Sequence, residues 1–296
     1  MMSVWTGLAI WFIELVVVAM LANSRRHARA CLMVTLMMLA LPAFVIDPRL
    51  IAIFVLMGGV LFCAIRTADF AIDGPLNGFR ARFAHLVAVI DTRLIKHCPR
   101  RLDMRSVMRL LVGLAFAIAA IWLVGKAQSL EGWRHYALRW FAGGFVLAPA
   151  LFMAVDALRA LIGTAFGREF PILSDAPLLS RSVNEFWTKR WNRVVSKILH
   201  DRFYKPLAKY GTTFALFAAF AASAALHAWL IGIPMGAACA ASWAAFFLVQ
   251  PLLILIERRL RVRHWRPALG WLWTMSALGL VSPLFTEPLL RWLEKF

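Results

Sequence analysis

His227 is the residue whose chemistry stands out most, because it lies inside the apolar run Phe217–Ile231. An ionisable side chain within a membrane-spanning helix is costly and marks a candidate functional site. The small residues Ala221–Ala225 before it allow close helix packing or a lumen. An apolar setting disfavours the imidazolium form, so a neutral His227 could accept a proton as a general base. The alternative is a neutral histidine that hydrogen-bonds between helices.

A second group of candidate residues lies about 35 residues upstream, within Pro171–Leu207. Ser182 and Glu185 have the spacing of a capping box, in which each side chain pairs with the other residue's free backbone N–H. The pattern predicts one basic amphipathic helix that starts near Val183 and lies at the cytoplasmic surface. The apolar face of this helix is formed by Trp187, Trp191, Val194, Val195, Ile198 and Leu199.

Asn192 borders the tryptophan face of this predicted helix, between Arg190 and Arg193. The planar, permanently charged guanidinium group of arginine is well suited to phosphate. A basic, Trp-rich helix at this surface could hold the polyphosphate end of a nucleotide-like donor. The alternatives are anionic lipid headgroups as partners, or a helix that has only a structural role.

The composition indicates that these residues belong to a membrane protein. Of 296 residues, 62% are hydrophobic and only 16% are charged, which is far more apolar than a soluble domain. Apolar runs of about 20 residues, the length that a bilayer core requires, recur along the chain and predict about eight spans in a single domain, residues 1–296. The predicted spans are Ser3–Asn23, Ala30–Ile46, Arg49–Ile65, Val107–Gly125, Leu138–Gly163, Tyr210–Ile231, Met235–Ile256 and Ala268–Phe285. Tight turns are predicted at Asp47-Pro48 and Gly232–Pro234.

The net charge of +18 is explained by where the basic residues lie, without nucleic-acid binding. If the N-terminus faces outward, most of the 33 Lys and Arg fall in or beside the inward loops, as the positive-inside bias requires. This pattern predicts a multi-pass protein of a bacterial inner membrane or of the endoplasmic reticulum, with both termini non-cytoplasmic and membrane lipids as partners. The inward loops are Ser24–Arg29, Arg66–Ser106, Thr164–Lys209 and Glu257–Pro267.

The second inward loop contains another amphipathic segment, Phe79–Ile95, with arginine opposite its apolar face. It predicts a helix at the cytoplasmic interface or, alternatively, a docking helix for a partner. Arg66 and Asp69, at the inward end of the third span, are expected to be interfacial. The four cysteines have no CxxC or Cys/His spacing, so neither a metal site nor a disulfide framework is predicted.

Among the other polar residues of the spans, a structural role is expected. Asp156 and Arg159 are one helical turn apart and could pair. Glu14 and Gln250 could line a chamber, but hydrogen bonding between helices accounts for them more simply.

The sequence EFWTKRWN at Glu185–Asn192, followed by Phe203–Pro206 and Ser223–His227, resembles the membrane-bound O-acyltransferases, and in particular their wax-synthase-like branch. Pro177–Ser180 also resembles that branch. Together these segments lie within Pro171–Leu230. The resemblance implies an all-α integral membrane fold of about eight transmembrane helices with cytoplasmic interfacial amphipathic helices.

The resemblance also implies roles for individual residues. His227 matches the family's catalytic histidine and would take the proton of an acceptor hydroxyl, while Asn192 matches its motif asparagine and would donate a hydrogen bond to the reacting thioester. A long-chain acyl-CoA co-substrate would come from the cytosol and a hydroxyl acceptor from lipid, with no cofactor. The substrate-binding residues would be Glu185, Trp187, Arg190, Trp191 and Tyr204.

Some features of this implied enzyme stay open. The acceptor could be a fatty alcohol, a sterol, a glyceride or a specialised metabolite, and neither acyl length nor oligomeric state follows from the sequence. Thr188 and Lys189 stand where the family often has Gly-Arg, a departure that bears on donor preference more than on the chemistry.

Two other functions fit eight spans with buried polar groups. One is a transporter of a lipid or small molecule, although the sequence shows no clear internal repeat or matching pair of broken helices. The other is a non-catalytic lipid-binding scaffold with the same fold. Transport predicts flux into vesicles without chemical change, an enzyme predicts ester products, and a scaffold predicts neither.

Overall fold

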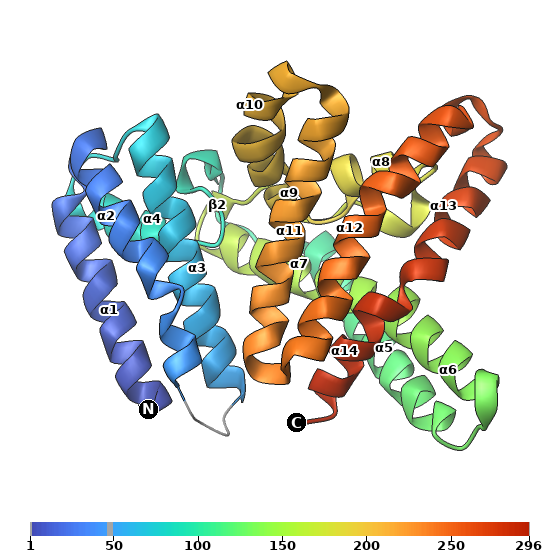
Figure 1. The fold of residues 1–296 in the computed structure, drawn as a ribbon. Helices are drawn as coiled ribbons and strands as arrows, with labels where there is room; N and C mark the ends of the chain where they lie inside the picture. The colour runs from blue at the N-terminus through green and yellow to red at the C-terminus, as the bar shows by residue number, and fades with distance from the viewer. Residues whose placement is uncertain (1, 46–49, 296) are drawn as a thin grey trace. The chain divides into compact units, whose positions relative to one another are not determined.

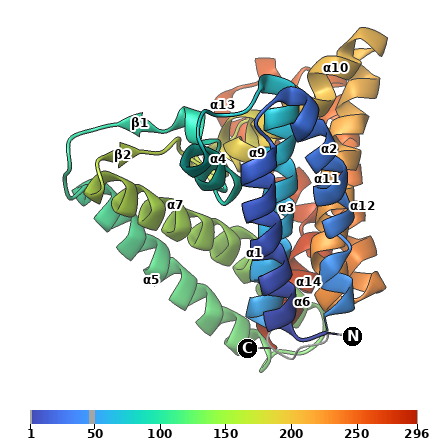
Figure 2. The same cartoon turned by 90° about the vertical axis from the view of Figure 1, so that its left-hand side faces the viewer.

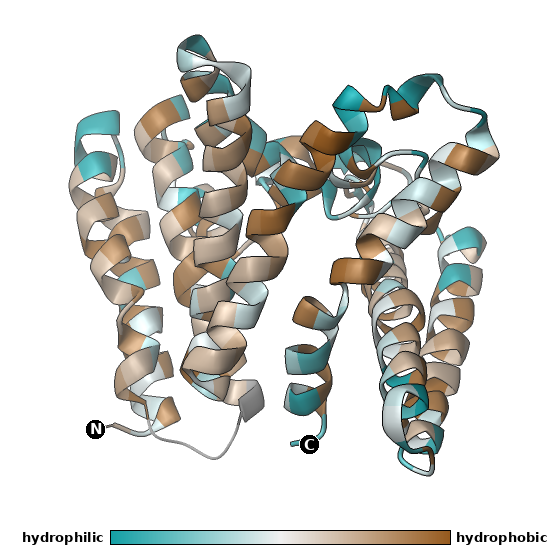
Figure 3. Cartoon of the chain, turned by 45° about the vertical axis from the view of Figure 1, so that its right-hand side comes forward, coloured by the Kyte–Doolittle hydropathy of each residue, from teal (hydrophilic) through white to brown (hydrophobic). Residues whose placement is uncertain are grey.

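Long apolar helices make up most of the computed structural model, which describes residues 2–45 and 50–295. These residues include seven helices long and apolar enough to cross a membrane, or eight if a bent pair near the C-terminus is one span. Figure 3 shows apolar residues along the lengths of the helices and most hydrophilic residues toward their ends. The chain is therefore a multi-pass, all-α integral membrane protein, as predicted. The predicted turn at Asp47-Pro48 lies outside the described residues.

The chain divides into two compact units, Met1–Ile95 and Lys96–Phe296. In the first unit, the close approach of α1 (Val4–Leu21) and α3 (Leu50–Asp73) depends on Gly59 of α3, where a Cβ atom would lie 2.5 Å from the ring of Trp11 of α1. That the two units act as one domain stays a prediction. The first unit contains α1 (Val4–Leu21), α2 (Arg25–Met38), η1 (Leu41–Phe44), α3 (Leu50–Asp73), α4 (Phe79–Leu86) and η2 (Thr92–Leu94) (Figure 1).

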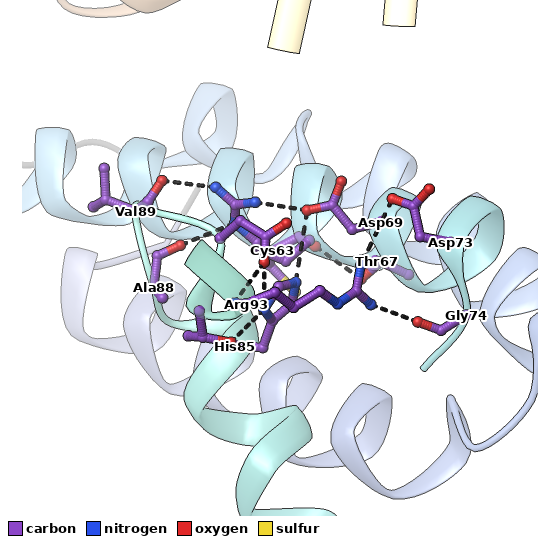
Figure 4. A network of polar contacts seen from close by, with 12 residues as sticks. Cys63, Thr67, Asp69, Asp73, Gly74, His85, Ala88, Val89 and Arg93 are labelled. Atoms are coloured by element: carbon purple, nitrogen blue, oxygen red, sulfur yellow. Dashed lines mark hydrogen bonds and ion pairs between the residues drawn. The ribbon is translucent and has the colours of Figure 1, made fainter. Parts of the chain in front are cut away.

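The predicted helix Phe79–Ile95 is too long, because only its first half, α4, is α-helical and a separate 3-10 turn, η2, follows at Thr92–Leu94. The guanidinium group of Arg66 donates to the carbonyls of Ala88 (3.1 Å) and Val89 (2.8 Å), which turn away from a helical path (Figure 4). Arg66 also pairs with Asp69 at 2.6 Å. Both side chains are buried within the protein, and their expected place at the membrane interface stays a prediction.

In the second unit, α5 (Met104–Ala127) and α7 (Ala148–Ala165) run side by side (Figure 2). Two antiparallel strands of two residues each, β1 and β2, lie at one end of this pair. Their contact depends on a small residue, because a Cβ atom at Gly113 would lie 3.0 Å from backbone atoms of Ala150 and Ala154. The elements up to residue 169 are β1 (Lys96–His97), α5 (Met104–Ala127), α6 (Gly132–Trp140), the π-helix η3 (Phe141–Leu147), α7 (Ala148–Ala165) and β2 (Arg168–Glu169).

The remaining spans of this unit are α11 (Thr212–Met235), α12 (Ala237–Arg259) and the pair α13 (Pro267–Val281) and α14 (Pro283–Leu293). The helix α11 runs through Pro234, so the predicted turn at Gly232–Pro234 is wrong. The chain turns instead at Gly236, whose φ of +87° is readily adopted only by glycine.

The predicted last span, Ala268–Phe285, is broken. The axes of α13 and α14 differ by 56° at Pro283, which has no N–H to continue the helix. The Ser282 hydroxyl donates to the Gly279 carbonyl (2.9 Å), and Ser242 of α12 donates to the Leu284 carbonyl (2.8 Å). Pro283 and Pro288 cannot donate to the carbonyls four residues before them, those of Gly279 and Leu284, and these serine side chains donate to them instead, as an apolar environment requires.

Candidate active site

The motif segment is not the continuous amphipathic helix that the sequence predicts. The helix breaks at Asn192, which has a left-handed φ of +40° that asparagine tolerates better than most residues. The Asn192 Oδ1 atom then accepts the Val195 N–H (3.4 Å) and caps the next helix. The elements are η4 (Pro177–Leu179), α8 (Val183–Glu185), the π-helix η5 (Phe186–Arg190), α9 (Arg193–Leu199), the π-helix η6 (His200–Tyr204), α10 (Lys205–Leu207) and η7 (Ala208–Tyr210).

The start of α8 is where the capping-box pattern places it, but only half of that box forms. The Ser182 hydroxyl accepts the Glu185 N–H (2.9 Å), as predicted. Glu185 instead accepts the N–H of Arg181 (2.9 Å). The carboxylate of Glu257, in α12, accepts the N–H groups of Val183 (2.7 Å) and of the next residue (2.9 Å). A side chain more than 70 residues away thus completes the cap.

A short segment without regular structure, Pro171–Asp175, runs along the break and is called the strap below. The Arg193 N–H donates to the Leu173 carbonyl (2.8 Å), and the Asn192 N–H approaches the Ser174 hydroxyl (3.4 Å). These bonds take the place of the helical bonds that the break removes.

Glu185 and Arg190, two of the predicted substrate-binding residues, pair with each other. The Arg190 Nε atom donates to Glu185 (2.7 Å), and Nη1 donates to the carbonyls of Asp175 (3.2 Å) and Ala176 (3.3 Å). Burial raises the pKa of the Glu185 carboxyl, but the backbone N–H of Arg181 and the guanidinium of Arg190 outweigh it, so the net pKa is lowered. This ion pair therefore holds the strap against η5.

The other five predicted site residues come together around one cavity of about 450 Å³, a volume typical of small-molecule sites. His227 reaches it from α11 and Asn192 from the break. Its remaining predicted lining residues are Trp187, Trp191 and Tyr204. The structure thus brings His227 and Asn192 to one space from elements that are separate in the sequence.

The hydrogen bond of His227 determines which ring nitrogen carries its proton. Its Nδ1 atom lies 2.7 Å from the Ser223 carbonyl, and a carbonyl only accepts, so Nδ1 carries the hydrogen. In the neutral ring, Nε2 then holds the lone pair, and it makes no hydrogen bond to any residue that the structure describes. The ring of Phe247 packs 3.9 Å away, centroid to centroid. An imidazole held in this way can accept a proton at Nε2.

Aromatic side chains form the wall between the break and α11. Trp187 donates from Nε1 to Gln250 (3.0 Å), which is fully buried, so Gln250 bonds between helices as expected. Trp191 packs on Phe152 of α7 at 4.4 Å and on Phe186 at 5.5 Å. Most of the cavity surface is therefore apolar.

All three π-helices of the second unit contribute to this cavity. Gly144 belongs to η3, Phe186 and Thr188 to η5, and Tyr204 to η6, and each of these residues lines the cavity. A π-helical turn shifts the register of the side chains that follow it and is frequent at functional sites. Nothing in the hydrophobic pattern predicts these turns.

A second, basic hollow adjoins the first, and it was not predicted from the sequence. Arg258 and Asn184 line both spaces. Arg261, Arg263 and the carboxylate of Glu257 also line the second. Arg258 interacts electrostatically with Glu257, whereas Arg261 and Arg263 form no ion pair with a carboxylate within the described chain. The basic run Arg258–Arg263 is visible in the sequence, where the positive-inside bias alone accounts for it.

Part of the sequence that forms this site is similar to proteins of a known family. Residues 170–249 match the family described as "Membrane bound O-acyl transferase family". Two similar proteins of Arabidopsis thaliana are named probable long-chain-alcohol O-fatty-acyltransferase 7 and 3. Both are 27% identical to this chain, over 150 residues (45% of this chain, 44% of the relative) and 179 residues (49% and 51%). A third, probable long-chain-alcohol O-fatty-acyltransferase 6, is 30% identical over 82 residues (25% and 24%). The chain matches about half the length of the first two relatives.

The fold and the site thus define a multi-pass membrane protein with an apolar cavity that contains a histidine and an asparagine. Within it, residues 170–249 match the model of the membrane-bound O-acyltransferase family, so the predicted resemblance is confirmed over this segment. This segment contains the strap, the break at Asn192 and His227.

The lowered pKa of Glu185 predicts a contribution to stability that depends on pH. A carboxyl with a lower pKa in the folded than in the unfolded chain stabilises fully well above its ordinary value of 4.5, and this contribution is lost as the pH falls through the folded value. Glu185→Gln should therefore lower the unfolding midpoint at neutral pH and differ less from the wild type on acidification. Thermal unfolding in detergent over a pH series measures this. The exposed Glu131, changed to Gln, is the control and should change little at any pH. A difference in unfolding midpoint between Glu185→Gln and the wild type that grows as the pH falls would contradict the prediction.

Proposed function

We propose that this chain is a membrane-embedded O-acyltransferase that forms an ester from a long-chain acyl-CoA and a hydroxyl acceptor. The observation that carries the proposal is the presence of His227 and Asn192 at one apolar cavity. The names of the relatives, long-chain-alcohol O-fatty-acyltransferases, support a long-chain alcohol as the acceptor and hence a wax-ester-synthase-like reaction.

In the proposed reaction, His227 Nε2 takes the proton of the acceptor hydroxyl while its oxygen attacks the thioester carbonyl carbon. The new C–O bond forms a tetrahedral intermediate, whose oxyanion accepts a hydrogen bond from the Asn192 amide. This amide is suited to donate, because Oδ1 faces the Val195 N–H and leaves Nδ2 for the cavity. The C–S bond then breaks, and the leaving thiolate takes the proton from the imidazolium. Neither a covalent acyl-enzyme nor a cofactor is needed.

The apolar lining favours alcohol over water as the acceptor. Aromatic side chains such as Phe220, Phe246 and Phe247 surround the space next to His227, and they offer water few partners. A long-chain alcohol gains from burial there, since each buried CH₂ contributes about 0.8 kcal/mol. We assign Trp187, Trp191 and Tyr204 to the acyl chain and thioester.

We assign the phosphates of acyl-CoA to the basic hollow, where three arginines, Arg258, Arg261 and Arg263, outnumber the one lining carboxylate, Glu257. The sequence pattern favours Arg190 for this role, but its Nε and Nη1 atoms already bond to Glu185 and the strap. Arg258 borders both spaces, so phosphates bound beside it would leave the thioester and acyl chain to extend into the cavity.

Removal of the proposed base should abolish most activity. His227→Ala should lower ester formation by about 10² to 10⁴-fold, the usual contribution of a positioned general base. Asn192→Gly, which keeps the left-handed backbone without the amide, should lower kcat by about 10² to 10³-fold. The double variant should lose less than the sum of the two effects, because both residues act on one transition state.

This assay uses purified protein in vesicles with radiolabelled acyl-CoA and a long-chain alcohol. His135→Ala is the matched control, since His135 lies in α6 and does not line the cavity. Near-normal ester synthesis by monodisperse His227→Ala would refute the mechanism. A wild type that forms no ester but moves lipid between vesicles would favour a transporter.

Arg258→Ala should raise the KM for acyl-CoA roughly tenfold with little change in kcat, because a phosphate contact is present before as well as in the transition state. The same variant should leave the KM for an acyl-pantetheine without these phosphates unchanged. Arg259→Ala, an exposed neighbour that lines neither space, is the control. An equal effect on both donors would assign Arg258 to another role.

Acyl-CoA is a cytosolic donor, so we propose that the basic hollow faces the cytosol and that both termini face the other side. With Cys98 changed to Ser, the other cysteines are buried. In that background, an impermeant thiol reagent added outside intact cells should label Ser129→Cys, between α5 and α6, but not Arg181→Cys. Both positions are exposed. Labelling of Arg181→Cys from outside would reverse the proposed orientation.

A further inference from the structure

Asp156 of α7 is buried where three separate parts of the second unit meet, with only 1% of its surface exposed. One carboxylate oxygen accepts from Arg159 (2.6 Å), so the predicted pair is confirmed, and also from the backbone N–H of Leu173 (3.0 Å). The other accepts from Arg109 of α5 (2.9 Å). Charge-assisted bonds from different directions hold this carboxylate in one place.

Leu173 transmits that position to the break in the motif segment. Its N–H donates to Asp156, while its carbonyl accepts the Arg193 N–H (2.8 Å). The hydroxyl of the next strap residue, Ser174, lies 3.4 Å from the backbone nitrogen of Asn192. The carboxylate of Asp156 is therefore two hydrogen bonds away from the residue that follows Asn192.

The same helix supports the other side of the break. Phe152 lies one turn before Asp156 on α7, and its ring packs on Trp191 at 4.4 Å. Asn192 thus has both neighbours held from α7, one by an aromatic contact and one through the strap. Because its left-handed backbone is costly, it persists only where the surroundings impose it.

We propose that Asp156 is a positioning residue for Asn192. Through Leu173 and the strap, it sets the backbone at the break and hence the direction of the Asn192 amide in the cavity. Asp156 does not line the cavity, so it acts without touching substrate. The inference rests on the proposed role of Asn192 in ester formation.

The test compares Asp156→Asn with the wild type in the ester assay, per correctly folded molecule. We expect kcat to fall by about 10 to 100-fold, since a displacement of about 1 Å at a reacting group can cost 10²-fold. The KM for acyl-CoA should change little, because the basic hollow does not involve the strap. In an Asn192→Gly background, Asp156→Asn should cause no further loss of kcat.

Asp156→Asn could fail to fold because it leaves two arginines without a carboxylate, so Ser174→Ala provides a second, milder variant. Ser174→Ala removes only a hydroxyl group. It should also lower kcat when Asn192 is present but not in the Asn192→Gly background. Asp103→Asn is the matched control. Asp103 caps α5 and asparagine caps equally well, so its kcat should equal that of the wild type.

The result that overturns the proposal is a lower unfolding midpoint with unchanged kcat in both Ser174→Ala and folded Asp156→Asn, because Asp156 then only stabilises the fold. An equal loss of kcat with and without the Asn192 amide would also overturn it. Failure of the proposed function gives a different pattern, in which the wild type forms no ester or His227→Ala keeps its activity.

Discussion

Wherever this chain leaves a helix beside apolar surroundings, its free backbone groups need partners, and a few polar side chains supply them. The Glu257 carboxylate accepts two N–H groups at the start of α8, and the Asp156 carboxylate accepts the Leu173 N–H. The Arg190 guanidinium donates to the carbonyls of Asp175, in the strap, and of the residue after it, and the Arg66 guanidinium donates to two carbonyls after α4. An unpaired backbone group buried in this way would cost on the order of several kcal/mol. These charged side chains therefore stabilise the irregular backbone after α4, along the strap and at the start of α8.

The irregular backbone is what brings the reacting groups together. A continuous helix would carry Asn192 and Trp187 in a fixed register, with roughly 100° between successive side chains. The π-turn of η5 and the left-handed Asn192 change that register, so Trp187, Trp191 and Asn192 all face one cavity. His227 needs no such device, because it lies in a regular part of α11 and takes its orientation from the carbonyl one turn earlier. The proposed base thus comes from rigid secondary structure, whereas the proposed oxyanion donor depends on tertiary contacts.

This difference explains how much the sequence could predict. Hydropathy placed the spans, since each is a local run of suitable length, and it also singled out His227 as an ionisable residue in an apolar run. The motif segment drew attention to Asn192, but its break was not predicted, because the residues that impose it are distant in the sequence. Ser174 lies 18 residues before Asn192, and Glu257 lies 74 residues after Val183. Amphipathic periodicity contains no information about such partners, so the pattern was interpreted as one uninterrupted helix.

The arginines fall into two groups by their bonding partners, a difference that the amino-acid composition cannot reveal. Arg66, Arg109, Arg159 and Arg190 all bond to carboxylates or carbonyls, and each side chain is at most 30% exposed. Arg258, Arg261 and Arg263 are exposed, and among the described residues none of them bonds to a backbone carbonyl; Arg258 interacts with Glu257, and the Arg263 Nε atom donates to His264 (2.9 Å). A guanidinium that bonds to backbone carbonyls has fewer donors left for a ligand, whereas these exposed groups keep most of their donors for phosphate. The excess of positive charge therefore has two roles: one group of arginines holds the irregular backbone of the site, and the other leaves a net positive surface beside the cavity.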